Sequence, residues 1–302
     1  MSVTGPIAVP TFPPWLRRPW ASGAVFGSTK ETVASLNLHT VCQSAHCPNI
    51  AECWAKGTAT FMVLGNTCTR NCAFCSVPSG PPESVDPAEP ENVARAVAAM
   101  RLKHAVVTTV VRDDLPDGGA AHVASCIRAI RAHNPSTTIE VLVSEYDGRH
   151  DIIGAVASVA PEVYGHNIET VRRLYPRVRD RRFTYENALE ALRAASALSP
   201  RSVIKSAMMG GHGETAEEVR ETLADLRGAG CDAVCIGQYL RPTAQQRPVA
   251  EYVHPSVFGI YEQWAYEIGF EFAVAGPFVR SSYRSEAVLE TKFARRKLSA
   301  PI

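Results

Sequence analysis

The chain has 302 residues, enough for one large α/β barrel-type domain or two smaller domains. Hydrophobic residues make up 46% and charged residues 20%, which is the profile of a globular protein with a sizeable core. A net charge of +1 excludes a strong field that would attract nucleic acid or anionic lipid. No apolar run approaches the roughly 18 residues that span a bilayer. We therefore expect no nucleic-acid partner and no membrane.

The first 20 residues do not have the pattern of a targeting segment. They lack the charged start and apolar core of a secretory signal and the Arg- and Ser-rich helix of a transit peptide. Prolines at positions 10, 13, 14 and 19 instead predict an irregular arm over the domain. The arm also carries residues that fit either docking of a partner or simple packing, namely Trp15, Arg17, Arg18 and Trp20. We expect a cytoplasmic location.

From residue 59 onward, short apolar runs typical of strands alternate with helical patterns. The six candidate strands are residues 59–64, 104–111, 137–143, 162–167, 202–208 and 232–237. The clearest helical patterns are residues 90–102, 186–198 and 214–227. This alternation predicts a parallel sheet with right-handed crossovers. Six units fit a partial (β/α)6 TIM-type barrel of the α/β class better than a closed eight-fold barrel, and an open doubly wound sheet is the alternative.

We expect three parts along the chain. Residues 1–58 would form an N-terminal extension, residues 59–269 the barrel, and residues 270–302 a C-terminal extension. In parallel α/β sheets, the chemistry lies beyond the carboxyl ends of the strands. Residues 68–75, which read Cys-Thr-Arg-Asn-Cys-Ala-Phe-Cys, lie just beyond the end of the first strand.

The chain has nine cysteines, and six of them lie between residues 42 and 75. An odd count argues against a disulfide framework, and the clustering indicates metal. Outside the cluster, Cys126 falls on an apolar helix and Cys235 in an apolar strand, so we expect both to fill the core.

Cys68, Cys72 and Cys75 have no fourth cysteine close behind them. Structural zinc needs four ligands, whereas a 4Fe–4S cluster held by three cysteines leaves one iron for an outside ligand. The spacing Cys-x3-Cys-x2-Cys, with Phe74 before the last cysteine, resembles the signature of radical S-adenosylmethionine (radical SAM) enzymes. The resemblance implies that the amino and carboxylate groups of S-adenosylmethionine bind the open iron.

A second triplet, Cys42, Cys47 and Cys53, has the spacing Cys-x4-Cys-x5-Cys. Alone it also fits a zinc site completed by His46. Together with the first triplet it resembles the lipoyl synthase family, and the similarity runs from about residue 38 to the Arg-Ser-Ser-Tyr of residues 280–283. Further matching stretches are residues 59–65, 112–120, 139–142, 166–179, 236–242 and 276–283.

The resemblance implies a partial barrel and a sulfurtransferase that inserts sulfur at C6 and C8 of an octanoyl group on a lipoyl carrier domain. Such carriers are the E2 subunits of 2-oxoacid dehydrogenases and the glycine cleavage H protein, or a peptide derived from them. Carried over by motif, Cys68, Cys72 and Cys75 would hold a reductive 4Fe–4S cluster. The second triplet would hold an auxiliary 4Fe–4S cluster, with Ser282 as the fourth ligand.

The implied chemistry suits an unactivated methylene, which has no acidic proton for a base to remove. The reductive cluster would cleave S-adenosylmethionine to a 5′-deoxyadenosyl radical, which would take a hydrogen atom from the methylene. The resulting carbon radical would then attack a sulfide of the auxiliary cluster. The reaction needs an electron donor such as ferredoxin or flavodoxin. It also needs an iron–sulfur carrier to rebuild the consumed cluster.

Several residues at or near the expected strand ends are candidates for binding the cosubstrate. They are Asp117, Gly118 and Gly119 after the second strand, His166 and Asn167 after the fourth, and Lys205 in the fifth. The alternatives are an ordinary charged loop and satisfied strand-end pairs. Arg280 would steady the serine-bearing loop or bind an acidic carrier.

The chain departs from the family pattern at Ser144-Glu145-Tyr146, Gly165, Ala207 and His212. None of these touches an expected cluster ligand, but they also fit a divergent paralogue. The alternative functions are another sulfur-inserting radical SAM enzyme, resembling biotin synthase or a methylthiotransferase, and a non-catalytic iron–sulfur carrier.

Overall fold

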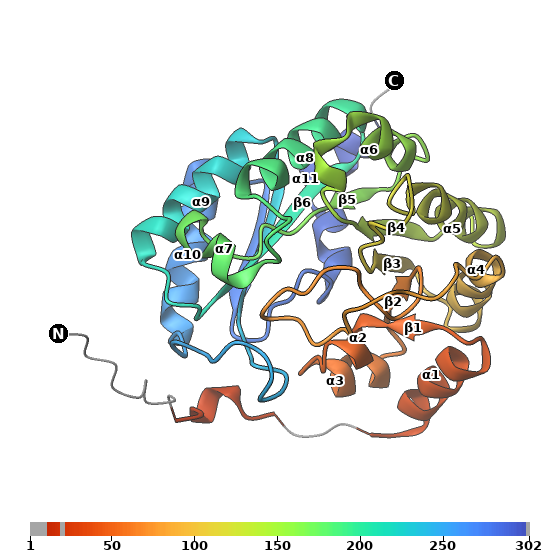
Figure 1. Ribbon diagram of the computed structural model, residues 1–302, viewed down its shortest axis with the longest axis horizontal. Helices are drawn as coiled ribbons and strands as arrows, with labels where there is room; N and C mark the ends of the chain where they lie inside the picture. The colour runs from red at the N-terminus through yellow and green to blue at the C-terminus, as the bar shows by residue number, and fades with distance from the viewer. Residues whose placement is uncertain (1–10, 19–21, 300–302) are drawn as a thin grey trace.

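A computed structural model describes residues 11–18 and 22–299, so Pro10, Pro19 and Trp20 lie outside the described residues. Its eight strands form one sheet in the order β1-β2-β3-β4-β5-β6-β7-β8. β1 (His39–Thr40) pairs with β2 antiparallel, and the other neighbours are parallel. A doubly wound sheet reverses its strand order, whereas here each strand pairs with the next one in sequence. The predicted partial barrel is therefore confirmed (Figure 1).

All six predicted strands are present. The parallel strands are β2 (Thr60–Val63), β3 (His104–Thr109), β4 (Thr138–Leu142), β5 (Val163–Gly165), β6 (Val203–Gly210), β7 (Ala233–Gln238) and β8 (Phe272–Gly276). The sequence analysis missed β8, which lies in the predicted C-terminal extension. Of its five residues only Ala273 is fully buried, so it lacks the continuous apolar run of a central strand.

The predicted helices are confirmed as α4, α8 and α9, and the longer helices lie outside the curved sheet (Figure 1). The α-helices are α1 (Ala24–Ser35), α2 (Val41–Ser44), α3 (Ile50–Ala55), α4 (Glu89–Ala99), α5 (Ala120–His133), α6 (His150–Ala157), α7 (Tyr175–Val178), α8 (Tyr185–Leu198), α9 (Ala216–Gly228), α10 (Pro255–Ile268) and α11 (Lys292–Ser299). Short 3-10 turns are η1 (Pro14–Leu16), η2 (Tyr146–Gly148), η3 (Arg172–Leu174) and η4 (Ser285–Glu290). None of the described helices is long and apolar enough to cross a membrane.

The amino ends of the strands are covered by the C-terminal segment. Val288 of η4 and Ala294 of α11 pack on the first residues of β5, β6 and β7. The carboxyl ends are thereby left for a site. Cys126 and Cys235 are buried at 0% and 3% exposure, which confirms that they fill the core, and Cys231 is buried with them.

Candidate active site

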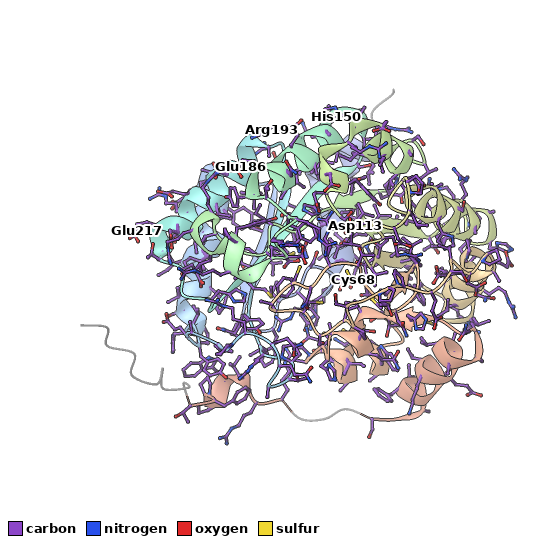
Figure 2. All side chains as sticks on the ribbon, viewed as in Figure 1. Cys68, Asp113, His150, Glu186, Arg193 and Glu217 are labelled. Atoms are coloured by element: carbon purple, nitrogen blue, oxygen red, sulfur yellow. The ribbon has the colours of Figure 1, made fainter. Side chains whose placement is uncertain are left out.

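A cavity of about 300 Å³ lies at the carboxyl ends of the strands. Residues from the ends of β2 to β8 line it, together with a stretch of the N-terminal segment around Cys47. Figure 2 shows Cys68 and Asp113 near the centre of the ring of helices, whereas His150, Arg193, Glu186 and Glu217 lie on the outer helices. The cavity thus lies where parallel α/β barrels place their active sites, at the carboxyl ends of the strands.

The first triplet lines this cavity, and backbone N–H groups point at its sulfurs. Arg70 and Val111 each donate to Cys68 Sγ at 3.4 Å, and Asp180 donates to Cys72 Sγ at 3.4 Å. Such donors stabilise thiolates and tune iron–sulfur clusters. Burial raises the pKa of the Cys75 thiol to about 12, so the positive charge of a metal group is needed to hold it as a thiolate. The donor set therefore fits a cluster.

The second triplet is also gathered at one place. Burial, followed by the neighbouring Cys47, raises the pKa of the Cys42 thiol to about 11. Burial, followed by Cys42 and Cys47, raises the pKa of the Cys53 thiol to about 12. Within residues 11–18 and 22–299, no three His, Cys, Asp or Glu side chains are arranged to hold a single metal ion. His46 has another neighbour, since its Nδ1 lies 3.2 Å from Ser76 Oγ. The three thiols of this triplet are therefore close enough to interact with one another, as the ligands of one metal group would be.

The segment after β8, residues 277–284, returns to the mouth of the barrel; we call it the serine loop. Its Arg280, Ser281 and Ser282 line the same cavity as Cys47. Burial lowers the pKa of Arg280, and the nearby Cys47 opposes the shift. Arg280 thus lies in the cavity wall, and both of its expected roles stay predictions. Coordination by Ser282 rather than Ser281 stays a prediction.

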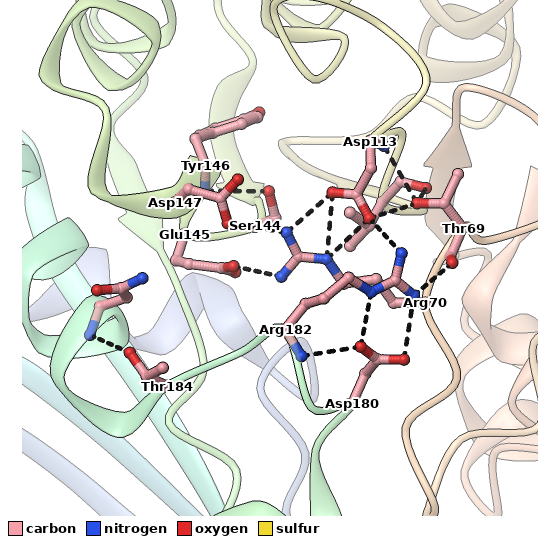
Figure 3. Close-up of polar contacts among 12 residues, drawn as sticks. Thr69, Arg70, Asp113, Ser144, Glu145, Tyr146, Asp147, Asp180, Arg182 and Thr184 are labelled. Atoms are coloured by element: carbon pink, nitrogen blue, oxygen red, sulfur yellow. Dashed lines mark hydrogen bonds and ion pairs between the residues drawn. The ribbon is translucent and has the colours of Figure 1, made fainter.

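Arg70, inside the first cysteine motif, ties the cluster-binding loop to its neighbours (Figure 3). Its guanidinium, 3% exposed, bonds Asp113 after β3 at 2.9 Å and Asp147 in η2 at 3.0 Å. It also pairs with Glu145, which is fully buried. The same group lies 4.1 Å from the Phe183 ring centroid, a cation–π contact. The loop is thereby fixed to the ends of two strands.

His166 and Asn167 lie in the cavity, as the sequence predicted for cosubstrate contact. His166 Nδ1 lies 2.8 Å from the Val143 carbonyl oxygen, so the proton sits on Nδ1 and Nε2 is an acceptor. Burial lowers the pKa of His166 to about 3, which keeps the ring neutral. Within the described residues, neither His166 Nε2 nor Asn167 Oδ1 has a hydrogen-bond partner. Buried polar atoms are normally paired, so both fit a polar ligand.

Four other candidates lie outside the described lining of the cavity. Asp117 caps α5, because its carboxylate accepts from Gly119 N at 3.0 Å and Ala121 N at 2.9 Å. Gly118 and Gly119 have φ of +58° and +84°, and a Cβ on Gly119 would lie 2.4 Å from Leu64 Cδ1. Lys205 is 1% exposed and pairs with Glu140 at 2.7 Å inside the barrel. Packing and pairing thus account for these residues, and cosubstrate contact stays a prediction.

The sequence analysis missed Arg179 and Glu169, although both lie in the matched stretch of residues 166–179. They line the cavity, and their charged groups are 3.8 Å apart. Arg179 lies 3.6 Å from the Phe183 ring centroid, and its Nε has no hydrogen-bond partner in the described part of the chain. A buried guanidinium facing a cavity can bind a carboxylate.

Residues 62–226, more than half of the chain, match the Radical SAM superfamily. The fold is similar to the FeFe-hydrogenase maturase HydG from Carboxydothermus hydrogenoformans, at 16% identity and a TM-score of 0.55 over 78% of this chain and 55% of that one. It is also similar to Streptococcus suis SuiB bound to S-adenosylmethionine, at 8% identity and a TM-score of 0.53 over 75% and 53%. The protein is thus a radical SAM enzyme.

Comparison with curated relatives shows to which family of radical SAM enzymes the chain belongs. The chain is 50% identical to the lipoyl synthase of Thermus thermophilus over 277 residues, 91% of this chain and 86% of the relative. It is 48% identical to that of Caldicellulosiruptor saccharolyticus over 91% and 96%, and 46% identical to the mitochondrial enzyme of Aspergillus niger over 94% and 70%. The chain belongs to the lipoyl synthase family. It is a sulfur-inserting enzyme that uses S-adenosylmethionine and two 4Fe–4S clusters.

Proposed function

We propose that the residues around this cavity carry out the family's reaction, the insertion of two sulfur atoms at C6 and C8 of a carrier-bound octanoyl group. The proposal is supported by one observation: Cys68, Cys72 and Cys75 line the cavity, and so do Cys47 of the second triplet and the two serines of the serine loop. A hydrogen-removing centre and a sulfur source must act on one carbon, so they need to share one chamber.

We assign the reductive cluster to Cys68, Cys72 and Cys75, and the auxiliary cluster to Cys42, Cys47, Cys53 and Ser282. When bound, the reductive cluster with S-adenosylmethionine supplies one-electron chemistry for removing a methylene hydrogen, and the auxiliary cluster supplies sulfur. The protein's own part is to hold thiolates with N–H donors, to orient the substrates and to exclude water.

Cosubstrate binding falls to polar groups of the cavity wall. The Arg179 guanidinium suits the methionine carboxylate, and the orphaned His166 Nε2 suits a ribose hydroxyl that donates to it. The Asn167 side chain can bond a second polar group. Phe74 adds apolar wall beside the cysteines. The octanoyl chain would lie on the remaining apolar lining, which includes Val41, Met62, Val110, Leu142 and Leu240.

The partners are proposals as well. We propose octanoylated E2 domains, the glycine cleavage H protein or derived peptides as carriers, ferredoxin or flavodoxin as donor, and an iron–sulfur carrier for repair. A cytoplasmic location and the division at residues 1–58, 59–269 and 270–302 are likewise proposed. The two extensions in this division also contribute to the sheet, since β1 lies in residues 1–58 and β8 in residues 270–302.

The test is anaerobic incubation of the reconstituted chain with an octanoylated carrier peptide, reductant and S-adenosylmethionine, followed by mass spectrometry. We expect a product that has gained two sulfurs and lost two hydrogens. A variant with Cys42, Cys47 and Cys53 all changed to Ala is the control and should leave the peptide unsulfurated. An unmodified peptide, despite both clusters and cosubstrate cleavage by the unaltered chain, would indicate a paralogue with another substrate.

A further inference from the structure

The serine loop, residues 277–284, has an unusual set of anchors for a connecting loop. Connecting loops on a surface are normally mobile. This one is bonded to the segment that carries the auxiliary cysteines, more than 200 residues earlier: the pairs Asn49–Phe278 and Glu52–Tyr283 are 229 and 231 residues apart in sequence.

Asn49 is the first anchor. It lies between Cys47 and Cys53, and only 1% of it is exposed. Its Nδ2 donates to the Phe278 carbonyl oxygen at 2.8 Å, while its Oδ1 accepts from Arg18 Nη1 at 3.0 Å. Both ends of the amide are therefore used, and removal of the side chain would leave the Phe278 carbonyl without this donor.

Glu52, next to Cys53, is the second anchor. Its two oxygens accept from the Tyr283 hydroxyl at 3.0 and 3.1 Å and from Arg284 Nη2 at 3.3 Å. It also accepts from Arg18 Nη1 at 2.8 Å. Hydrogen bonds to a charged acceptor are stronger than neutral ones, so this carboxylate holds the far end of the loop.

Arg18 of the N-terminal arm joins the two anchors. Besides its bonds to Asn49 and Glu52, its guanidinium carbon lies 3.8 Å from the Phe278 ring centroid and 5.9 Å from that of Tyr283. Cation–π contacts of this kind are attractive. One side chain thus touches the auxiliary segment and two residues of the serine loop.

The other side of the loop rests on the barrel. A Cβ on Gly237 of β7 would lie 2.0 Å from the Val279 carbonyl oxygen, so only glycine permits this approach. The loop is consequently held between β7 and the auxiliary segment, with Ser281 and Ser282 between its two bonded residues, Phe278 and Tyr283.

We propose that Arg18, Asn49 and Glu52 are positioning residues that hold the serine loop against the auxiliary cysteines. The inference rests on the proposed function, because that function gives the loop's serine an auxiliary cluster to reach. These residues bind no substrate; they determine where Ser282 is placed.

Hydrogen–deuterium exchange of the serine loop tests the proposal in both the reconstituted and the cluster-free chain. Glu52→Ala should raise exchange of residues 277–284 by about tenfold, since charged hydrogen bonds are lost, and Tyr283→Phe should raise it less. Exchange in β7 should not change. Lys56→Ala is the matched control: Lys56, which follows α3, pairs with Glu52 Oε1 at 2.7 Å and is 57% exposed, but none of its described bonds reaches residues 277–284.

Iron retention under a chelator separates this proposal from serine coordination. Faster exchange with loss of the auxiliary iron supports both. Faster exchange with full retention of auxiliary iron supports the anchors and contradicts coordination by Ser282. Unchanged exchange in Glu52→Ala and Tyr283→Phe, or an equal rise in Lys56→Ala, overturns the proposal whatever the iron content.

Discussion

The two cysteine triplets are held in different ways. The first occupies one loop of eight residues, and Arg70 within it bonds Asp113 and Glu145 at the ends of neighbouring strands. The second belongs to an N-terminal segment outside the parallel barrel, and one of the loops that bond to this segment comes from the far end of the chain. A reductive centre must stay in one place through many turnovers, whereas a sulfur source that is consumed must be rebuilt. A rigid loop suits the first task, and a site completed by a separate loop suits the second.

Removing the reductive triplet should have the largest effect. With Cys68, Cys72 and Cys75 all changed to Ala, cleavage of S-adenosylmethionine should be abolished, because the reductive cluster that would bind it is lost. Iron should fall from about eight to about four per chain, since each cubane contributes four. Anaerobic iron assay and detection of 5′-deoxyadenosine check this. Continued formation of 5′-deoxyadenosine would show that the reductive cluster lies elsewhere.

Removing the auxiliary triplet should break only the second half of the reaction. With Cys42, Cys47 and Cys53 changed to Ala, iron should again be about four, and cosubstrate cleavage should continue. Sulfur insertion should stop, because the source is gone. Mass spectrometry of the octanoylated peptide is the readout. A sulfurated peptide from this variant would remove the auxiliary cluster from the mechanism.

Ser282→Ala should slow sulfur insertion by about 10- to 100-fold, the range seen when the surroundings of a metal site are altered. Cosubstrate cleavage should be spared, because the reductive triplet is untouched. Ser282→Cys should keep the cluster but slow sulfur release, since thiolate is a softer ligand for iron. The measured quantity is sulfur inserted per cosubstrate cleaved.

Ser281→Ala is the comparison, because both serines lie in the turn of residues 281–284 and line the same cavity, whereas only Ser282 is proposed as the ligand. It should have the smaller effect. If Ser281→Ala slowed sulfur insertion as much as Ser282→Ala or more, the assignment of Ser282 as the ligand would be wrong.

Arg70→Gln should loosen the reductive loop. Glu145 would be left buried with an unpaired charge, which costs about 3 kcal/mol of stability when a buried partner is removed. We expect roughly tenfold slower cosubstrate cleavage with the auxiliary iron retained. Arg149→Gln, which removes an exposed ion pair with Asp151, is the control. Equal behaviour of the two variants would show that Arg70 does not hold the loop.

The smallest effect concerns pH. Burial, followed by Arg247, lowers the pKa of His212 from 6.5 to about 3, and the ring stacks on Tyr239 of the cavity wall. Below pH 6.5 the unfolded chain takes up a proton that the folded chain refuses, so stability falls as pH drops. At pH 5 the loss is about 2 kcal/mol. His212→Leu should reduce the difference in urea midpoint between pH 7 and pH 5. An unchanged difference would contradict this account.

Local patterns predicted much of the molecule. The six strands were visible because buried parallel strands are continuous apolar runs, and the triplets because cluster ligands have fixed spacings. β8 was missed because only its Ala273 is fully buried. Gly119 was a candidate for cosubstrate contact because a glycine-rich turn follows the second strand, but the sequence could not show that Leu64 lies where a Cβ on Gly119 would stand.

The anchors of the serine loop were beyond local patterns for another reason. Arg18, Asn49 and Tyr283 acquire their roles only when the fold joins both ends of the chain. The role of Arg179 was also hidden in the sequence, because its arginine-rich surroundings resemble an ordinary surface segment. Only the fold shows that Arg179 lines the cavity.

The origin of the inserted sulfur tests the central claim most directly. The chain is reconstituted with sulfur-34 sulfide, freed of unbound sulfide, and given octanoylated peptide, reductant and S-adenosylmethionine in the presence of ordinary sulfide. The account predicts that both sulfurs of the first-turnover lipoyl product are sulfur-34, because they come from the auxiliary cluster. A first-turnover product carrying ordinary sulfur would contradict it.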